Sequence, residues 1–456
     1  MNSLLTLAAE RAAHYLATLD ARGVAPSPDD IARLAALGGS LPDGPTEPEA
    51  VIAQLDDIGS PATVGTAGQR FFGFVIGGSL PVTVAANWLA TAWDQNVGLW
   101  AASPTGSALE EIALGWLVDA LKLPPGTGGA FVTGATVANF TALAAARHAV
   151  LARQGWDVGA DGLFGAPEIT VVVGDEAHPS LLKSLGLLGL GKKRVVRVPT
   201  DDQGRMRADA LPALSGPAIV CVQAGNVNTG AFDPAGAIIP WAHDAGAWVH
   251  VDGAFGLWAA VAPDRAHLVA DFADADSWAT DAHKWLNVPY DSGLAFVRDP
   301  DILRAAMIMS ADYLPKTERR EPSEYTPELS RRARGVEIWA AIKTLGRAGL
   351  SDLVERTCRQ AQRFADGLSA AGYPILNDVV LNQVLVSFGD QDAVQRVVRG
   401  IQSDGTCWCG GTVWQGHPAM RISVSSWATT DEDVERSLDA ILRVAAREGA
   451  TTARPV

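Results

Sequence analysis

The sequence predicts an α/β protein with a mostly parallel sheet, an N-terminal helical segment and a smaller C-terminal α+β domain. Three observations predict this class. Short apolar runs alternate with helical patterns between residues 128 and 299, as is typical of a parallel sheet whose two faces are both covered by helices. The first 60 residues carry helical patterns only. After about residue 345, long amphipathic helical patterns surround two weaker strand patterns. We therefore expect three regions, at residues 1–100, 101–344 and 345–456.

The N-terminal region is expected to consist of helices joined by the loop "GGSLPDGPTEPEA". Its first apolar patch is interrupted by Glu10, Arg11 and His14, which favours an amphipathic helix over a signal peptide. A further helix is predicted over residues 107–123. There Ser107 and Glu110 have the spacing of a capping box, and apolar residues follow at helical spacing.

The alternating region follows in order. Strands are predicted at residues 128–133, 168–175, 193–199, 217–225, 247–256 and 293–299, with helices at 135–153, 178–190 and 234–246. The stretch 276–293, "DSWATDAHKWLNVPYDSG", fits neither a clean helix nor a clean strand. In the C-terminal domain, strands are predicted at 379–388 and 419–427.

Composition narrows the function classes. The 456 residues are 48% hydrophobic and carry a formal net charge of −15, which argues against binding to nucleic acid or anionic lipid through bulk electrostatics. Four cysteines in a long chain favour a reducing, cytoplasmic location, and Cys407 and Cys409 lack the second ligand pair of a metal site. No apolar run reaches ~18 residues, so no membrane span is expected.

Candidate binding residues follow the predicted strands, where open α/β sheets bind their ligands. Gly134, Ala135 and Thr136 lead from a strand into a helix, and backbone N–H groups at a helix N-terminus suit a phosphate. An ordinary helix start is the alternative. His178 follows the next long strand, although a single histidine at such a place is more often structural. Asn226 lies in a polar turn that simple turn chemistry also explains.

Two charged residues are more informative. Asp252 ends an apolar strand, where a carboxylate is costly unless it meets a cation; a helix cap or an arginine partner is the alternative. Lys284 lies among apolar and aromatic residues, and an amine in such a setting is suited to form a Schiff base. A surface lysine with its stem along apolar neighbours is the alternative. A phosphate cradle, a buried acid, a histidine and a lysine together suit pyridoxal 5′-phosphate (PLP), with Ala254 small enough to lie under the ring.

Several segments resemble the group II PLP-dependent amino-acid decarboxylases, a family that includes aromatic-L-amino-acid and glutamate decarboxylases. "SWATDAHKW" matches the lysine motif of that family. "HVDGAFG" is similar to its aspartate motif, with Gly253 where alanine is commoner, and "DEAHPS" is similar to its histidine stretch. The resemblance extends from about Arg70 to Leu442. It implies the fold of the PLP-dependent transferases of fold type I, which is also the aminotransferase scaffold.

The resemblance also implies roles for the candidate residues. Lys284 would carry PLP as a Schiff base, Asp252 would pair with the pyridine nitrogen, and His178 and Ala254 would lie against opposite faces of the ring. The phosphate would be held by Gly134, Ala135 and Thr136, with His283 nearby, and Asn226 falls where relatives often have a threonine. The family's mobile loop usually supplies a tyrosine that returns a proton. Tyr313 and Tyr325 are the candidates, and Tyr325 is the closer to the expected place. His178 is the alternative catalytic group for returning the proton.

The implied reaction is decarboxylation of an L-amino acid to an amine and carbon dioxide. Fourteen tryptophans and Phe71, Phe72 and Phe74 favour an aromatic substrate, although such residues are more often core. An aminotransferase using Arg421, a carbon–carbon lyase or an aldehyde-forming enzyme on the same scaffold are alternatives. A non-catalytic α/β binding protein is the alternative from another class. The family usually forms homodimers, and the expected partner is a small amino acid, with no metal, nucleic acid or membrane.

Overall fold

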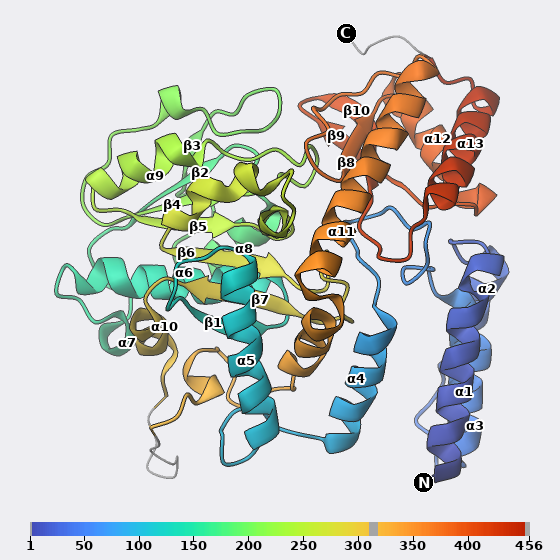
Figure 1. Ribbon diagram of the computed structural model, residues 1–456, viewed down its shortest axis with the longest axis horizontal. Coiled ribbons are helices and arrows are strands. Elements are labelled where there is room, and N and C mark those ends of the chain that lie inside the picture. The colour runs from blue at the N-terminus through green and yellow to red at the C-terminus, as the bar shows by residue number, and fades with distance from the viewer. Residues whose placement is uncertain (1, 310–317, 452–456) are drawn as a thin grey trace. The chain divides into compact units, whose positions relative to one another are not determined.

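The computed structural model describes residues 2–309 and 318–451 (Figure 1). The chain forms two compact units, one made of residues 1–78, 360–376 and 384–456, and the other of residues 79–359 and 377–383. These boundaries differ from the three sequential regions expected from the sequence, because the N-terminal helices share a unit with the C-terminal segment. Within that unit Arg70 pairs with Asp433 at 3.0 Å, and the Phe72 N–H donates to the Trp408 carbonyl at 2.8 Å.

The larger unit contains a seven-stranded sheet in the order β1-β7-β6-β5-β4-β2-β3. Its strands are β1 (Gly128–Val132), β2 (Thr170–Gly174), β3 (Val196–Val198), β4 (Ala218–Gln223), β5 (Trp248–Asp252), β6 (Ser277–Asp281) and β7 (Gly293–Val297). Only β7 runs antiparallel to its neighbours, so the predicted mostly parallel sheet is confirmed. Because six strands point the same way, their carboxyl ends meet at one edge.

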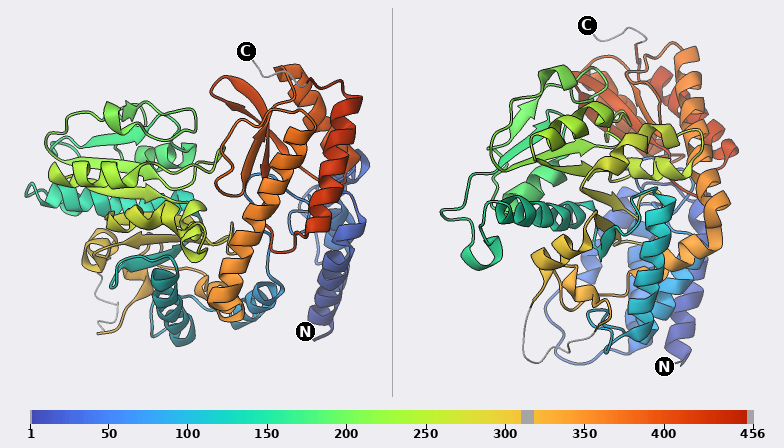
Figure 2. Two further views of the ribbon diagram at one scale, coloured as in Figure 1. Left: turned by 45° about the horizontal axis from the view of Figure 1, so that its top comes forward. Right: turned by 60° about the vertical axis from the view of Figure 1, so that its left-hand side comes forward.

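Helices cover both faces of this sheet (Figures 1 and 2). From β2 the chain passes through α8 (Pro179–Leu187) to β3, the strand at one edge of the sheet. From β4 it passes through α9 (Ala235–Asp244) to β5, which lies in the opposite direction across the sheet. Since such crossovers are right-handed, these two helices lie on opposite faces. The alanine-rich α6 (Ala135–Ala152) packs beside α8 and across β5, β6 and β7. The direction of winding changes between β2 and β4, which is where sheets of this kind bind ligands.

Two predictions about elements of this unit were wrong. The unassigned stretch 276–293 begins with strand β6, whose five residues are all buried. Its polar side chains are satisfied inside the protein, as when Ser277 accepts the indole N–H of Trp248 at 2.8 Å. Helix α5 (Pro104–Ala120) begins at a proline, a favoured first helical residue, so Ser107 and Glu110 lie inside the helix and do not cap it.

The remaining helices of the larger unit are α4 (Pro81–Trp93), α7 (Val158–Asp161) and α10 (Pro300–Met307). Helix α11 (Gly335–Ala370) begins in this unit and breaks at Gly346, whose φ of 58° is readily adopted only by glycine.

The smaller unit contains α1 (Asn2–Thr18), α2 (Pro28–Arg33), α3 (Pro48–Gln54), α12 (Gln391–Asp404) and α13 (Asp431–Arg447). The second sheet has the order β8-β10-β9, with β8 (Gln383–Val386), β9 (Gly410–Trp414) and β10 (His417–Ser423). Strand β9 was not predicted, because it is glycine-rich and half exposed. Among the described residues, no helix is both long enough and apolar enough to cross a membrane.

Candidate active site

The candidate residues gather at the edge of the large sheet where the parallel strands end. Gly134 follows β1, His178 follows β2, Asn226 follows β4, Asp252 ends β5 and Lys284 follows β6. The register places Asp252 beside Gln223 on one side and Ala279 on the other. The predicted common edge is therefore present.

Lys284 lies in the turn directly after β6 and contacts the acid that ends this strand. Its Nζ is 3.0 Å from Asp281 Oδ2, and its side chain is 19% exposed. The other oxygen, Asp281 Oδ1, accepts the backbone N–H of Ala135 at 2.5 Å. Asp281 therefore connects the lysine to the first turn of α6. Sequence reasoning missed Asp281, although it carries the same signal as Asp252, an acid at the end of a buried strand.

The N-terminus of α6 is closely packed against the segment after β6. An added Cβ at Gly134 would lie 3.1 Å from His283 Cε1, and one at Gly293 would lie 2.4 Å from the Gly134 Cα. As the residue before the helix, Gly134 offers no side chain to cap it, so the N–H groups of the first turn are left for an anion. Of these, the Ala135 N–H is already used by Asp281.

His283 is held rigidly beside this turn. Its Nδ1 accepts the Ser292 N–H at 3.1 Å, and its ring stacks on Tyr290 at 4.3 Å between centroids. Burial lowers the pKa of His283, although the nearby Asp281 carboxylate opposes this effect. The ring is therefore neutral at pH 7.

Asp252 is a buried carboxylate with a single neutral donor. Asn139 Nδ2 donates to Asp252 Oδ2 at 3.3 Å. Burial raises the pKa of Asp252, and the charges of His178 and Lys284 act in the opposite direction. Asp252 and His178 line the same hollow at the ends of β2, β4 and β5. A cation placed in that hollow would stabilise the ionised acid.

The other predicted residues, Ala254, Thr136 and Asn226, differ in how directly they contact the residues around Lys284 and Asp252. The Ala254 carbonyl accepts the Asp281 N–H at 2.9 Å, so Ala254 lies beside the lysine turn. The Thr136 carbonyl accepts the Ser184 hydroxyl, which ties the start of α6 to α8. Asn226 is buried, and its side chain holds its own turn, accepting the N–H groups of Asn228 and Thr229. These contacts give Asn226 a role in shaping the turn after β4.

The structure does not bring Tyr325 to the lysine of the same chain. Tyr325 lies under the guanidinium of Arg320 and lines a hollow with Gly128 and Pro300. These two residues lie at the opposite end of the strands from Lys284. Arg320 fixes this position, because its Nη2 donates to the Gly129 carbonyl at 2.6 Å. Tyr313, the other predicted tyrosine, lies outside the described residues. Arg421 lies on β10 and belongs to the smaller unit.

The residues at the sheet edge fit PLP. The group offers an amine on Lys284, an uncapped helix N-terminus that suits the phosphate, and a buried carboxylate that a protonated pyridine nitrogen would satisfy. The His178 ring is kept in place by Ser180, whose Oγ is 2.7 Å from His178 Nδ1.

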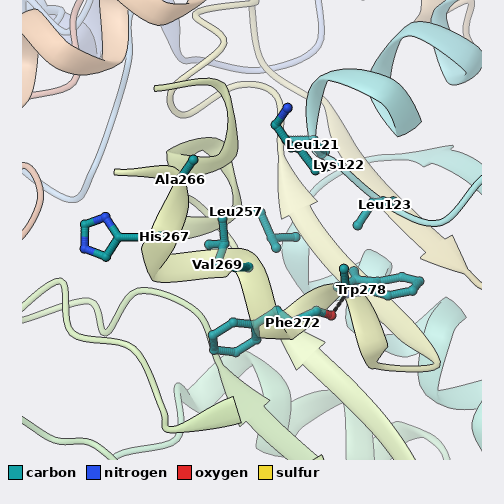
Figure 3. Close-up of a pocket in the computed structure, with 11 residues that line it drawn as sticks. Leu121, Lys122, Leu123, Leu257, Ala266, His267, Val269, Phe272 and Trp278 are labelled. Carbon is teal, nitrogen blue, oxygen red and sulfur yellow. Dashed lines mark hydrogen bonds between the residues drawn. The ribbon is translucent and has the colours of Figure 1, made fainter. Parts of the chain in front are cut away.

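A second cavity of the larger unit has no acidic side chain in its lining, so it lacks the pair of lysine and acid found at the strand ends (Figure 3). Its volume is about 410 Å³, and its walls are mainly apolar, including Leu257, Phe272 and Trp278. The indole N–H of Trp278 is used by the Phe272 carbonyl at 2.8 Å, and the His267 ring points away from the other side chains. The site at the strand ends is therefore the candidate active site.

Comparisons with known proteins identify the family and the fold of this chain. A family model for the pyridoxal-dependent decarboxylase conserved domain matches residues 33–388. Tryptophan decarboxylase 1 of Oryza sativa subsp. japonica is 30% identical over 334 residues, which are 67% of this chain and 64% of that protein. The chain thus matches slightly less than two thirds of this relative.

Other relatives widen the range of activities. L-2,4-diaminobutyrate decarboxylase of Rhizobium meliloti is 30% identical over 400 residues, covering 82% of this chain and 78% of that protein. Phenylacetaldehyde synthase of Arabidopsis thaliana is 25% identical over 435 residues, covering 87% and 86% respectively. The crystal structure of Oryza sativa TDC with PLP and tryptamine superimposes with a TM-score of 0.89 at 23% identity, over 98% of this chain and 97% of that chain. The overall fold is therefore shared with that structure.

Proposed function

The chain belongs to the pyridoxal-dependent decarboxylase family, and from this premise we propose that it converts an L-amino acid to the corresponding amine and carbon dioxide. The observation that carries the proposal is the pair of charged groups at the strand ends. Lys284 offers a half-buried amine, and Asp252 is a buried carboxylate that accepts a hydrogen bond from the neutral amide of Asn139. A PLP-dependent enzyme of this fold uses a lysine to hold the cofactor and an acid to pair with its pyridine nitrogen.

When bound, PLP supplies an aldehyde that condenses with amines and a ring that accepts the electron pair of a breaking bond at Cα. We assign the Schiff-base amine to Lys284, and Asp281 holds that amine in place at 3.0 Å. Asp252 would pair with the pyridine nitrogen and favour its protonated form. Gly134, Ala135 and Thr136 would hold the phosphate, with neutral His283 nearby, and Ala254 and His178 would contact the ring.

A proton must return to the substrate Cα after carbon dioxide leaves. Among the described residues, His178 is the candidate that lines the same hollow as Asp252. Tyr325 contacts Arg320 near the opposite end of the strands, so its predicted catalytic role lacks support from this chain alone. We therefore propose His178 as the group that moves this proton.

The similarity to phenylacetaldehyde synthase supports a second candidate function, an aldehyde-forming reaction. Dioxygen would be the oxidant of this reaction, in place of the return of a proton to Cα. The amino acid, dioxygen and water would then give the aldehyde, carbon dioxide, ammonia and hydrogen peroxide. Measuring amine, aldehyde and hydrogen peroxide from one incubation separates the two reactions. Amine with carbon dioxide supports the decarboxylase, and equal amounts of aldehyde and peroxide support the alternative.

We propose an aromatic amino acid as the substrate, because relatives of this chain include tryptophan decarboxylase 1. The diaminobutyrate relative makes a basic amino acid the main competitor. Release of carbon dioxide from a panel of aromatic, acidic and basic amino acids tests the choice. A keto acid without carbon dioxide would instead indicate the aminotransferase.

Binding of PLP at the proposed lysine provides the first experiment. The purified protein is expected to gain a visible absorption band when PLP is added, and Lys284→Ala should abolish it. Lys183→Ala, at an exposed position on α8, is the matched control and should keep the band. A band that survives in Lys284→Ala contradicts the assignment of the lysine.

We also propose a homodimer in the cytoplasm. Helix α4 carries an exposed face of apolar residues, including Trp88, Leu89 and Trp93, at 45%, 55% and 42% exposure. A helix that faces water normally carries polar residues on its outer side, so a second copy of the chain is a reasonable cover. The cytoplasmic location is supported by the four cysteines, all buried as free thiols.

A further inference from the structure

Next to Asp252, buried polar side chains on one face of the sheet connect with a side chain of α6. Trp248, His250 and Asp252 are alternate residues of β5, so their side chains share one face of the sheet. Ser277 on β6 is the register partner of His250. Asn139 reaches this face from α6 and is fully buried, as are His250 and Ser277.

These side chains form one continuous chain of hydrogen bonds. The Trp248 indole N–H donates to Ser277 Oγ at 2.8 Å, and Ser277 Oγ is 2.9 Å from His250 Nδ1. His250 Nε2 is 2.8 Å from Asn139 Oδ1, and Asn139 Nδ2 donates to Asp252 Oδ2 at 3.3 Å.

The chemistry of each group determines which atom donates in each of these hydrogen bonds. An indole N–H can only donate and an amide oxygen can only accept, so His250 Nε2 must carry a proton. Burial lowers the pKa of His250 to about 3, so its ring is neutral at pH 7. His250 Nδ1 then offers only a lone pair, which accepts the Ser277 hydroxyl proton. From Trp248 to Asn139, every donor therefore points toward Asp252.

We propose that Asn139, held by neutral His250, is a positioning residue that orients the Asp252 carboxylate and favours its ionised form for the pyridine nitrogen of PLP. The inference rests on the proposed function, because it needs PLP at this site. Asn139 touches neither the substrate nor the reacting atoms; it acts through Asp252. A neutral donor suits this role because it stabilises the carboxylate and leaves the negative charge for the cofactor.

The charged surroundings of Asp252 make this donor important. His178 and Lys284 favour the ionised carboxylate, whereas burial and the charge of Asp281 disfavour it. Cys221 on the neighbouring strand β4 also lies close enough for the Asp252 charge to act on its thiol. Removing the Asn139 donor therefore raises the pKa of Asp252 further. Since PLP binding needs the ionised acid, binding should then be lost at a higher pH.

The test compares PLP affinity in apoprotein variants. Asn139→Leu keeps the approximate volume and removes both hydrogen bonds. It is expected to weaken PLP binding about tenfold at pH 7, the usual effect of a lost hydrogen bond to a charged group. The acid limb of the affinity against pH should also move to higher pH. Thr141→Val, at another fully buried position of α6 that lines no part of the site, is the matched control and should change neither quantity.

The outcomes separate this inference from the proposed function. A folded Asn139→Leu protein with unchanged PLP affinity and an unchanged pH profile overturns the inference alone. Wild-type protein that does not bind PLP at Lys284 overturns the proposed function, and the inference with it. If Asn139→Leu does not fold, as judged by circular dichroism, Asn139→Ala replaces it, because alanine adds no volume and favours the helix. The same two measurements then decide.

Discussion

At the scale of single residues, Gly253 shows how the site depends on an absent side chain. It stands where the family more often has alanine, directly between Asp252 and Ala254. A Cβ at Gly253 would lie 2.3 Å from the Cγ of Leu257, which is buried. The Gly253 N–H also donates to the Ala279 carbonyl at 2.9 Å, so the backbone cannot easily retreat. The side chain of Leu257, four residues later, therefore leaves no room for a Cβ at Gly253.

We predict that Gly253→Ala destabilises the protein by about 1–3 kcal/mol, the usual cost of overpacking a core. Leu257→Ala creates space at the same point, so the double variant should lose less stability than the sum of the single variants, by about 1 kcal/mol or more. Urea unfolding followed by tryptophan fluorescence measures all three. Strictly additive losses would show that the contact between these two positions is not the cause.

The residues predicted from the sequence are those whose chemistry shows locally. Lys284 and Asp252 stand out because a charge in an apolar stretch is costly without a purpose. Asn139 and His250 could not be found in this way, because their partners lie on different elements 111 residues apart in sequence. The surroundings of Tyr325 could not be predicted for a similar reason, since its contact with Arg320 and its place near Gly128 depend on how the chain returns to the sheet.

At the scale of elements, one buried ion pair fastens the segment before α11 to its neighbours. The Arg331 guanidinium is fully buried and pairs with Glu110 of α5 at 2.8 Å. It also donates to the Val97 carbonyl at 3.0 Å and to the Phe131 carbonyl of β1 at 2.6 Å. Three segments therefore depend on this one side chain.

We predict that Arg331→Met lowers the free energy of unfolding by about 3–5 kcal/mol, because the buried Glu110 carboxylate keeps only its longer contact of 3.8 Å with Arg320. Arg347→Ala removes the exposed pair with Asp119 and should cost at most about 1 kcal/mol. The midpoints of urea unfolding of the two variants provide the measurement. Equal losses would mean that burial does not govern the strength of the Arg331 pair.

Elements were predicted well where burial produces an uninterrupted apolar run, as in β2 and β4. Strand β6 was missed because Ser277 and Thr280 make it look polar. Both hydroxyls find partners only after folding, Ser277 with Trp248 and His250, and Thr280 with the Ala254 carbonyl at 3.3 Å. Local pattern carries no information about such partners. The start of α5 was misplaced by one turn because Pro104 begins the helix ahead of the apparent capping box.

At the scale of the whole molecule, the sequence indicates the large sheet but not the make-up of the two units. The N-terminal helices join the C-terminal segment through contacts such as Arg70 with Asp433, which are 363 residues apart. No composition change marks such a pairing. The alternating pattern of the larger unit, in contrast, lies within one continuous stretch and was predictable as a sheet.

The outer face of α4 supplies the prediction for the assembled protein. Pro81, Ala85, Trp88 and Ala92 recur at helical spacing and are all exposed, with Leu89 and Trp93 beside them. At about 25 cal/mol per Å², covering such a face stabilises association. We therefore expect sedimentation to give twice the chain mass of 47.7 kDa at micromolar concentration.

Leu89→Asp places a charge on this face of α4 and should shift the protein to the monomer, because an unpaired charge at a buried contact is strongly unfavourable. Leu187→Asp introduces the same change at an exposed leucine of α8 and is the matched control, which should remain dimeric. A wild-type monomer at these concentrations would remove the homodimer from the proposal. A dimeric Leu89→Asp would place the contact on a different surface, and Lys284 and Asp252 would keep their assigned roles in either case.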